Sequence, residues 1–221
     1  MNGKTALVAG GSGLVGSEIL KLLIQSSAFD RIKIIARKPL GTNNEKVSEI
    51  IVDFDELNHF SQRLSADVIF CCLGTTIRTA GSQENFRKVD YTYCFELAKA
   101  AKTQGAKEFI LVSSLGADSN SANFYLRTKG EIENAIAALN FDSFCILRPS
   151  MLLGNRKESR AGETVGKIFM QATGFLFAGP LKKYKAIEAE TVARCMLELA
   201  KNPEKGKLIF ESDLIAKFEK N

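Results

Sequence analysis

The amino-acid sequence predicts an α/β fold with a doubly wound parallel sheet and a small C-terminal cap. Short apolar, β-branched runs alternate with segments of helical periodicity along most of the chain. These runs are apolar throughout, as expected for strands that helices cover on both faces. The chain has 221 residues, 45% of them hydrophobic. We therefore expect one domain over residues 1–221, in which residues 150–221 contribute the cap on the substrate side.

Glycine, proline or polar residues bound the strands and helices expected before residue 150. The expected strands cover Lys4–Ala9, Arg31–Arg37, Val47–Asp53, Asp67–Leu73, Lys107–Ser114 and Asp142–Arg148. The expected helices cover Leu14–Ile24, Glu56–Leu64, Gln83–Gln104 and Ala122–Leu139. After Pro149 we expect a polar loop, two helices over Thr164–Thr173 and Glu190–Lys201, and a closing strand over Lys207–Phe210.

The sequence GGSGLVG, which leads from the first strand into the first helix, holds three glycines at a fixed spacing, Gly10, Gly13 and Gly16. One glycine permits a tight turn, one lets backbone N–H groups approach a pyrophosphate, and one lets the helix pack closely on the strand. The helix N-terminus adds a partial positive charge. This strand–turn–helix context favours dinucleotide binding, as in a Rossmann fold, over a purely structural turn. The expected contacts are Gly10, Ser12, Gly13, Leu14, Val15 and Gly16.

The end of the second strand predicts which dinucleotide is bound. NAD-binding units carry an acidic residue about 20 residues after the glycines, where it binds the ribose 2′-hydroxyl. This chain has Arg37 and Lys38 at that place. A cation pairs with a 2′-phosphate, so the sequence favours NADP(H) over NAD(H). The competing interpretation is an ordinary surface arginine at a strand end.

Two further strand ends supply candidate cofactor contacts. Asp53 and Phe54 follow the third strand, where Asp53 is placed either to bind the adenine amino group or to cap the next helix. Leu73, Gly74 and Thr75 follow the fourth strand, near the expected ribose position. A simple strand-ending turn is the alternative there.

A second motif, YLRTK, places Tyr125 and Lys129 four residues apart, on one face of a helix. Ser113 and Ser114 end the preceding strand. In a reductase, the lysine ammonium favours the phenolate and holds the nicotinamide ribose, and the phenol exchanges a proton with a carbonyl oxygen. A serine hydroxyl at the end of that strand stabilises charge on the same oxygen.

These motifs resemble the short-chain dehydrogenase/reductase superfamily of the atypical kind, and most closely its Tat-interacting-protein oxidoreductases. The resemblance covers nearly the whole chain and is carried by VDFDEL, FCCLGTT, SSLGAD, YLRTKGEIE and FDSFCILRPSMLLGNRKESRAGE. It implies a Rossmann fold, NADPH binding and a catalytic set of Ser114, Tyr125 and Lys129. It also implies that Pro149 lies beside the nicotinamide carboxamide. Asp90 stands where many members have asparagine, so a proton relay through that position is not carried over.

The sequence therefore predicts an NADPH-dependent oxidoreductase that transfers hydride to or from a small carbonyl or alcohol substrate. Two other functions stay open: a regulatory NADP(H) sensor with little or no turnover, and an NAD-dependent epimerase or dehydratase of sugar nucleotides. A protein partner is compatible with each of them.

Composition argues against several other classes of function. The net charge of +5 comes from scattered basic residues, which does not predict nucleic-acid binding. Five cysteines without a CxxC pair and a single histidine do not predict a metal site. No apolar run reaches the roughly 18 residues of a membrane span. An odd number of cysteines and no recognisable signal peptide predict a cytoplasmic location.

Overall fold

The computed structural model describes residues 3–154 and 184–219. Its strands form one seven-stranded sheet and a small two-stranded sheet. The large sheet has the order β3-β2-β1-β4-β5-β6-β9, and every pairing in it is parallel. Its strands are β1 (Lys4–Ala9), β2 (Phe29–Ala36), β3 (Val47–Ile51), β4 (Val68–Cys71), β5 (Glu108–Val112), β6 (Ser143–Arg148) and β9 (Gly206–Glu211). The strand order reverses between β1 and β4, where doubly wound sheets bind their ligands.

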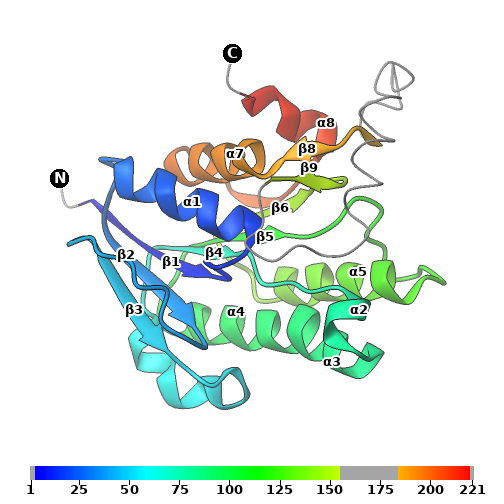
Figure 1. Cartoon of the computed structure of the whole chain (residues 1–221), viewed down its shortest axis with the longest axis horizontal. Coiled ribbons are helices and arrows are strands. Elements are labelled where there is room, and N and C mark those ends of the chain that lie inside the picture. The colour runs from blue at the N-terminus through cyan, green and yellow to red at the C-terminus, as the bar shows by residue number, and fades with distance from the viewer. Residues whose placement is uncertain (1–2, 155–183, 220–221) are drawn as a thin grey trace.

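Helices cover both faces of this sheet (Figure 1). Helices α1 (Leu14–Gln25) and α7 (Ala189–Lys201) lie on one face, and α4 (Cys94–Thr103) and α5 (Phe124–Ala137) lie on the other. Successive strand residues enter the two cores alternately: Val8 packs on the α1 side and Leu7 on the α4 side. Both faces are therefore apolar, which explains the uninterrupted hydrophobic runs and confirms the predicted fold class.

The expected helix over residues 83–104 is three consecutive segments. These are α3 (Gln83–Arg87), the π-helical η2 (Lys88–Tyr93) and α4. Phe86, Asp90 and Cys94 recur every four residues and are all buried, a spacing that the wider π turn accommodates. The segment η1 (Phe54–Leu64), expected as an α-helix, has 3₁₀ geometry with a break at Glu56.

The C-terminal elements belong to the body of the fold. Strand β9 extends the sheet beside β6, and α7 packs against α1. Residues 155–183 and 220–221 of the expected cap lie outside the described residues, and the first of these ranges includes the helix expected over residues 164–173. A cap on the substrate side stays a prediction.

Short elements that periodicity did not predict complete the structure. A two-stranded parallel sheet joins β7 (Leu152–Leu153) to β8 (Ile187–Glu188). Three brief helical segments were also not expected: α2 (Ile77–Ala80), α8 (Ser212–Ile215) and η5 (Ala216–Phe218). Elements of two to four residues are too short to show the hydrophobic repeat of 2.0 residues in strands or 3.6 residues in helices.

Candidate functional site

The glycine loop requires glycine at two of its positions because of backbone geometry. Gly10 has a φ of 82°, and a Cβ built there would lie 2.5 Å from the carbonyl oxygen of Cys72. A Cβ at Gly16 would lie 2.0 Å from the carbonyl oxygen of Gly10. The first turn of α1 thus packs directly against the end of β1, and the loop crosses the switch point between β1 and β4.

The N-terminus of α1 fits the pyrophosphate of a dinucleotide. Gly13 is its N-cap, no side chain caps the helix, and the first turn contains no acidic residue. Ser12 and Gly13 are exposed, so the first backbone N–H groups of the helix are open to an anion. Leu14 is half-buried, and the Val15 side chain lies in the core. Val15 can therefore contact a cofactor only through its backbone.

Arg37 and Lys38 directly follow the last residue of β2, and both are exposed. Neither forms an ion pair or a side-chain hydrogen bond with any residue in the two described ranges. Two cations that have no partner among the described residues thus stand at the strand end that flanks the glycine loop. Such groups can pair with a phosphate.

The residues after β3 have structural roles of their own. Oδ1 of Asp53 accepts a hydrogen bond from the Asp55 backbone N–H at 3.0 Å, which is the capping role that the sequence left open. The ring of Phe54 is buried and packs on Tyr93 at a centroid distance of 5.2 Å. Phe54 can therefore meet adenine only through its backbone. The adenine contact of Asp53 stays a prediction.

The loop after β4 is attached to a buried acid. The Thr75 backbone N–H donates to Oδ2 of Asp90 at 2.8 Å. A Cβ at Gly74 would lie 3.4 Å from Oδ1 of Asp90 and 3.7 Å from Nζ of Lys129. Gly74 and Thr75 thus lie beside the predicted catalytic lysine, whereas Leu73 packs against the α4-side core.

Lys129 forms a buried ion pair with Asp90. Its Nζ lies 2.7 Å from Oδ1 of Asp90, and the two side chains are 6% and 0% exposed. Burial by itself lowers the pKa of Lys129. The charge of Asp90, with smaller effects from Tyr125 and Cys94, outweighs burial and raises the pKa above its usual value. Lys129 is therefore a cation at neutral pH, and a carboxylate compensates its charge.

Tyr125 lies on α5 and Ser114 follows β5, the helix and the strand that the sequence predicted for them. Tyr125 is half-buried on α5, one turn before Lys129, and its ring packs on Phe86 at a centroid distance of 5.3 Å. Ser114 follows β5 and is half-buried. The neighbouring Ser113 is buried, and its hydroxyl donates to Glu133. The Ser114 hydroxyl makes only a long bond, 3.4 Å, to the Leu115 carbonyl and none to a side chain of the described residues.

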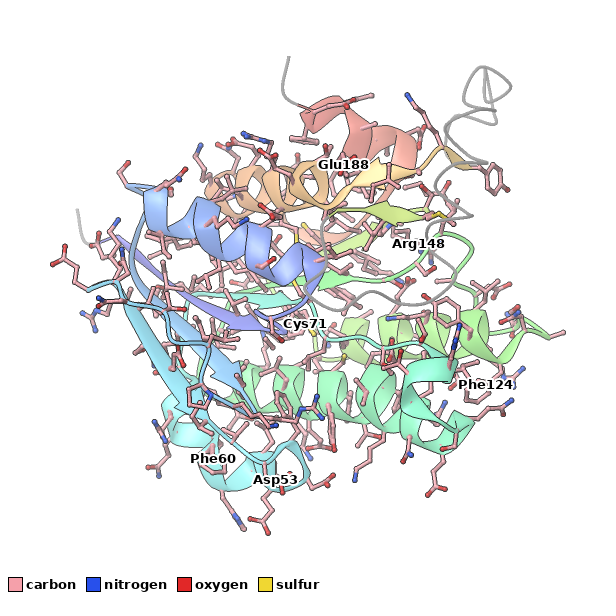
Figure 2. The ribbon with its side chains drawn as sticks, viewed as in Figure 1. Asp53, Phe60, Cys71, Phe124, Arg148 and Glu188 are labelled. Carbon is pink, nitrogen blue, oxygen red and sulfur yellow. The ribbon has the colours of Figure 1, made fainter. Side chains whose placement is uncertain are left out.

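Glu133 joins α5 to the ends of two strands. Its carboxylate accepts from the Ser113 hydroxyl and, at 3.0 Å, from Nε of Arg148, whose NH2 group makes a second bond to it. Figure 2 shows Arg148 at the end of β6. The Pro149 carbonyl accepts the Leu115 backbone N–H at 2.9 Å, which ties the end of β6 to the loop after β5. These bonds hold the helix that carries Tyr125 and Lys129 against the sheet.

Sequence reasoning missed the roles of Asp90 and Glu133. Glu133 lies on the same stripe of α5 as Tyr125 and Lys129, at a spacing of four residues. An acid on a face that must be buried indicates a buried partner, and this signal was available in the sequence. Asp90 offered the analogous signal between the apolar positions of Phe86 and Cys94.

In the described part of the chain, no helix is both long and apolar enough to cross a membrane. Within the same residues, no three His, Cys, Asp or Glu side chains are grouped as metal ligands would be. Residues 165–180, VGKIFMQATGFLFAGP, are an apolar stretch of the sequence, and they lie outside the described residues.

Comparisons with known proteins agree with the nucleotide-binding geometry. A family model described as NAD(P)H-binding matches residues 10–203. Protein HTATIP2 of Rattus norvegicus is 36% identical over 94% of this chain and 86% of its own length. The mitochondrial protein FMP52 of Candida albicans is 37% identical over 92% of this chain and 91% of its own length.

Solved structures with this fold include sugar-nucleotide enzymes. The UDP-N-acetylglucosamine 4-epimerase of Methanobrevibacter ruminantium matches with a TM-score of 0.72 and 18% identity, over 96% of this chain and 77% of its own. WbmH of Bordetella bronchiseptica, solved in complex with NAD+, matches with a TM-score of 0.70 and 16% identity, over 95% and 75%. At these identities the likeness shows the fold alone.

The predicted cytoplasmic location is wrong by these comparisons, because several of the fungal relatives are named mitochondrial proteins. The prediction depended on the odd number of cysteines and on the lack of a recognisable signal peptide. The cysteines indicate only a reducing environment, which is not restricted to the cytoplasm, and a secretory signal peptide does not mark mitochondrial proteins.

Proposed function

Because the chain belongs to the NAD(P)H-binding family, in the group of the Tat-interacting proteins, we propose that it is an NADPH-dependent oxidoreductase for a small carbonyl or alcohol substrate. The observation that carries this proposal is the buried Lys129 beside Gly74, on the same helical stripe as Tyr125. A lysine held at the carboxyl end of β4 is positioned for a nicotinamide ribose. Tyr125, one turn away, then faces the reacting carbon.

Bound NADPH supplies a hydride to the carbonyl carbon. The Tyr125 hydroxyl donates its proton to the carbonyl oxygen, which completes the alcohol, and the phenol regains a proton from solvent. Ser114 donates a hydrogen bond to the same oxygen and stabilises the charge that develops there. Lys129 orients the ribose and is itself held by Asp90.

The preference for NADPH is proposed from Arg37 and Lys38, two exposed cations at the end of β2. Their guanidinium and ammonium groups are suited to pair with a 2′-phosphate and have no matching partner in the ribose hydroxyl of NADH. Sugar-nucleotide epimerases that use NAD have less need of such cations. We therefore rank the epimerase hypothesis below the reductase.

The first experiment compares the dissociation constants of NADPH and NADH, measured by cofactor fluorescence, in the wild type and in Arg37→Ala. We expect the wild type to bind NADPH more tightly and Arg37→Ala to lose most of that preference. Arg31→Ala is the matched control, because Arg31 is an exposed arginine at the opposite end of β2. Equal affinities in the wild type would contradict the proposed cofactor.

The second experiment tests the proton donor. Tyr125→Phe should lower turnover of a carbonyl substrate by about 10²- to 10⁴-fold, the usual contribution of a general acid. NADPH affinity should stay within about twofold, since the phenol contacts the substrate. Tyr91→Phe, a half-buried tyrosine on η2, is the matched control. A fully active Tyr125→Phe variant would refute the assignment.

One observation favours a second candidate, a regulatory protein that binds NADP(H) with little turnover. Asp90 compensates the charge of Lys129, so less of that charge acts on the phenol of Tyr125. A panel of aldehydes, ketones and quinones with NADPH separates the two functions. Tight NADPH binding without hydride transfer to any member of the panel would favour the regulator.

A further inference from the structure

The loop that follows β2 is attached to a carboxylate on the neighbouring strand. The backbone N–H of Leu40 donates to Oε2 of Glu49 at 2.8 Å, and the N–H of Thr42 donates to Oε1 at 2.9 Å. Gly41, between them, has a φ of 70°, and this conformation turns both N–H groups toward one anion. Glu49 thus holds residues 37–42, which we call the specificity loop, at two points.

The same loop packs against the glycine motif. Glu49 pairs with Ile34 in the register of β2 and β3, and Ile34 belongs to the core on the α1 side. Leu40 packs on this core, and its Cδ1 lies 3.2 Å from the position that a Cβ of Gly11 would occupy. The specificity loop therefore folds back over the face of the sheet that carries α1 and the pyrophosphate site.

We propose that Glu49 is a positioning residue for cofactor choice: by binding the Leu40 and Thr42 amides, it holds Arg37 and Lys38 where a 2′-phosphate binds. The inference rests on the proposed preference for NADPH. Glu49 touches no part of the cofactor and acts only through the loop.

The hydrogen bonds themselves keep this clamp charged. Those from Thr42 and then Leu40 lower the pKa of the Glu49 carboxyl, against a smaller opposing effect of burial. The carboxylate is therefore ionised at neutral pH and accepts both amides at full strength.

The sign of the expected effect separates positioning from simple electrostatics. A carboxylate near a 2′-phosphate repels it, so removing that charge would by itself strengthen NADPH binding. Loss of a positioning clamp has the opposite effect, because the two cations lose their fixed place. Glu49→Gln is the sharpest variant, since it keeps the side-chain volume but removes the charge and one of the two acceptors.

The experiment measures the dissociation constants of NADPH and NADH for the wild type, Glu49→Gln and Glu49→Ala. Glu45→Gln is the matched control, because Glu45 is an exposed acid in the same connection with no ion pair to the described residues. We expect NADPH affinity to fall by about tenfold in both Glu49 variants, or ~1.4 kcal/mol. NADH affinity and that of the control should stay within about twofold.

Amide hydrogen exchange reports the clamp independently of any cofactor. In the apo Glu49→Gln protein, the Leu40 and Thr42 amides should exchange faster, while amides of β1 keep their protection. In a background that carries both Arg37→Ala and Lys38→Ala, adding Glu49→Gln should leave the NADPH-to-NADH affinity ratio unchanged, because the clamp acts through those two cations.

Three outcomes would overturn the inference: an unchanged affinity ratio, a stronger preference for NADPH, or an equal loss of both affinities. The last would indicate general damage to the fold. Failure of the proposed function looks different, because the wild type itself would then bind the two cofactors equally. A wild type that prefers NADPH, with Glu49→Gln retaining that preference, rejects only the role of Glu49.

Discussion

Nζ of Lys129 lies 2.7 Å from Oδ1 of Asp90, and the second oxygen of that carboxylate accepts the Thr75 backbone N–H. One buried acid thus connects the π-helical segment, the helix of the YLRTK motif and the loop after β4. Lys129 cannot leave its place without exposing an unpaired carboxylate to the interior. The pair also determines how much positive charge reaches Tyr125.

Asp90→Asn should shift the pH dependence of alcohol oxidation. The amide keeps an acceptor near Lys129 but no longer compensates its charge, so burial lowers the pKa of the Lys129 ammonium. The alkaline limb of the kcat/KM profile, on which Lys129 loses its proton, should therefore move down by about one pH unit or more. Asp90, Tyr125 and Cys94 are the titratable groups that act on Lys129. An unmoved profile would show that the compensation of charge has no part in the reaction.

Gly16→Ala and Gly13→Ala should fail in different ways. A methyl group at Gly16 meets the Gly10 carbonyl at 2.0 Å, so the turn must move and the thermal midpoint should drop by several degrees. At Gly13 the nearest atom, the Gly10 carbonyl oxygen, is 3.2 Å away and the position is exposed, so the loss of stability should be smaller than at Gly16. NADPH affinity should nevertheless fall, because the methyl group occupies the approach of the pyrophosphate. Identical thermal midpoints for the two variants would contradict this geometry.

Glu133→Gln should destabilise the protein, and Glu131→Gln should not. Glu133 is 2% exposed at its side chain and pairs with Arg148, so its loss leaves a largely buried guanidinium without its anion. We expect a loss of about 3 kcal/mol in the free energy of unfolding, from urea titration. Glu131 pairs with Arg87 at the surface, where such pairs contribute about 1 kcal/mol or less. Equal losses of unfolding free energy in the two variants would mean that the buried Glu133 pair stabilises the protein no more than the exposed Glu131 pair.

The thiols of Cys72, which is half-buried, and of Cys195, which is buried, should resist alkylation in the folded protein. Loss of solvent, aided by Cys94, raises the pKa of Cys72 to about 12, and burial, aided by Cys145, does the same for Cys195. A raised acid pKa keeps the thiol protonated, so only about one thiol in 10⁴ is thiolate at pH 8. Mass spectrometry after iodoacetamide at pH 8 should find both unmodified, and both should react in urea. Rapid labelling of the native protein would contradict these raised pKa values.

Local patterns predicted the sheet and the glycine loop well. The strand Lys4–Ala9 has the expected bounds, and α1 begins at Leu14 as expected. The helix expected over residues 83–104 was wrong in detail, because a run of helical periodicity does not distinguish a π turn from an α turn. The buried Asp90 marks the place where they differ. Its partner Lys129 is far along the chain, beyond the range of any periodic pattern.

The sequence was enough to name the candidate site residues, but it predicted only part of how their side chains are arranged. Tyr125 and Lys129 lie one turn apart because both are on α5, which helical spacing guarantees. Local sequence could not show that Ser113 is committed to Glu133 while Ser114 is not. It also could not show that Phe54 and Val15 turn their side chains into the core. Which side chain is free depends on partners from other strands.

Local sequence is enough to predict the alternation of strands and helices, the glycine turn and the cations after the second strand. These follow from periodicity, backbone sterics and charge, which act over a few residues. The folded chain alone shows that Asp90 meets Lys129, that Glu133 joins α5 to β5 and β6, and that Glu49 holds the specificity loop. Asp90 and Glu133 meet partners from distant segments, and burial makes an unpaired charge there costly enough to select those contacts. Glu49 meets its partners because the pairing of β3 with β2 brings it beside the loop that follows β2.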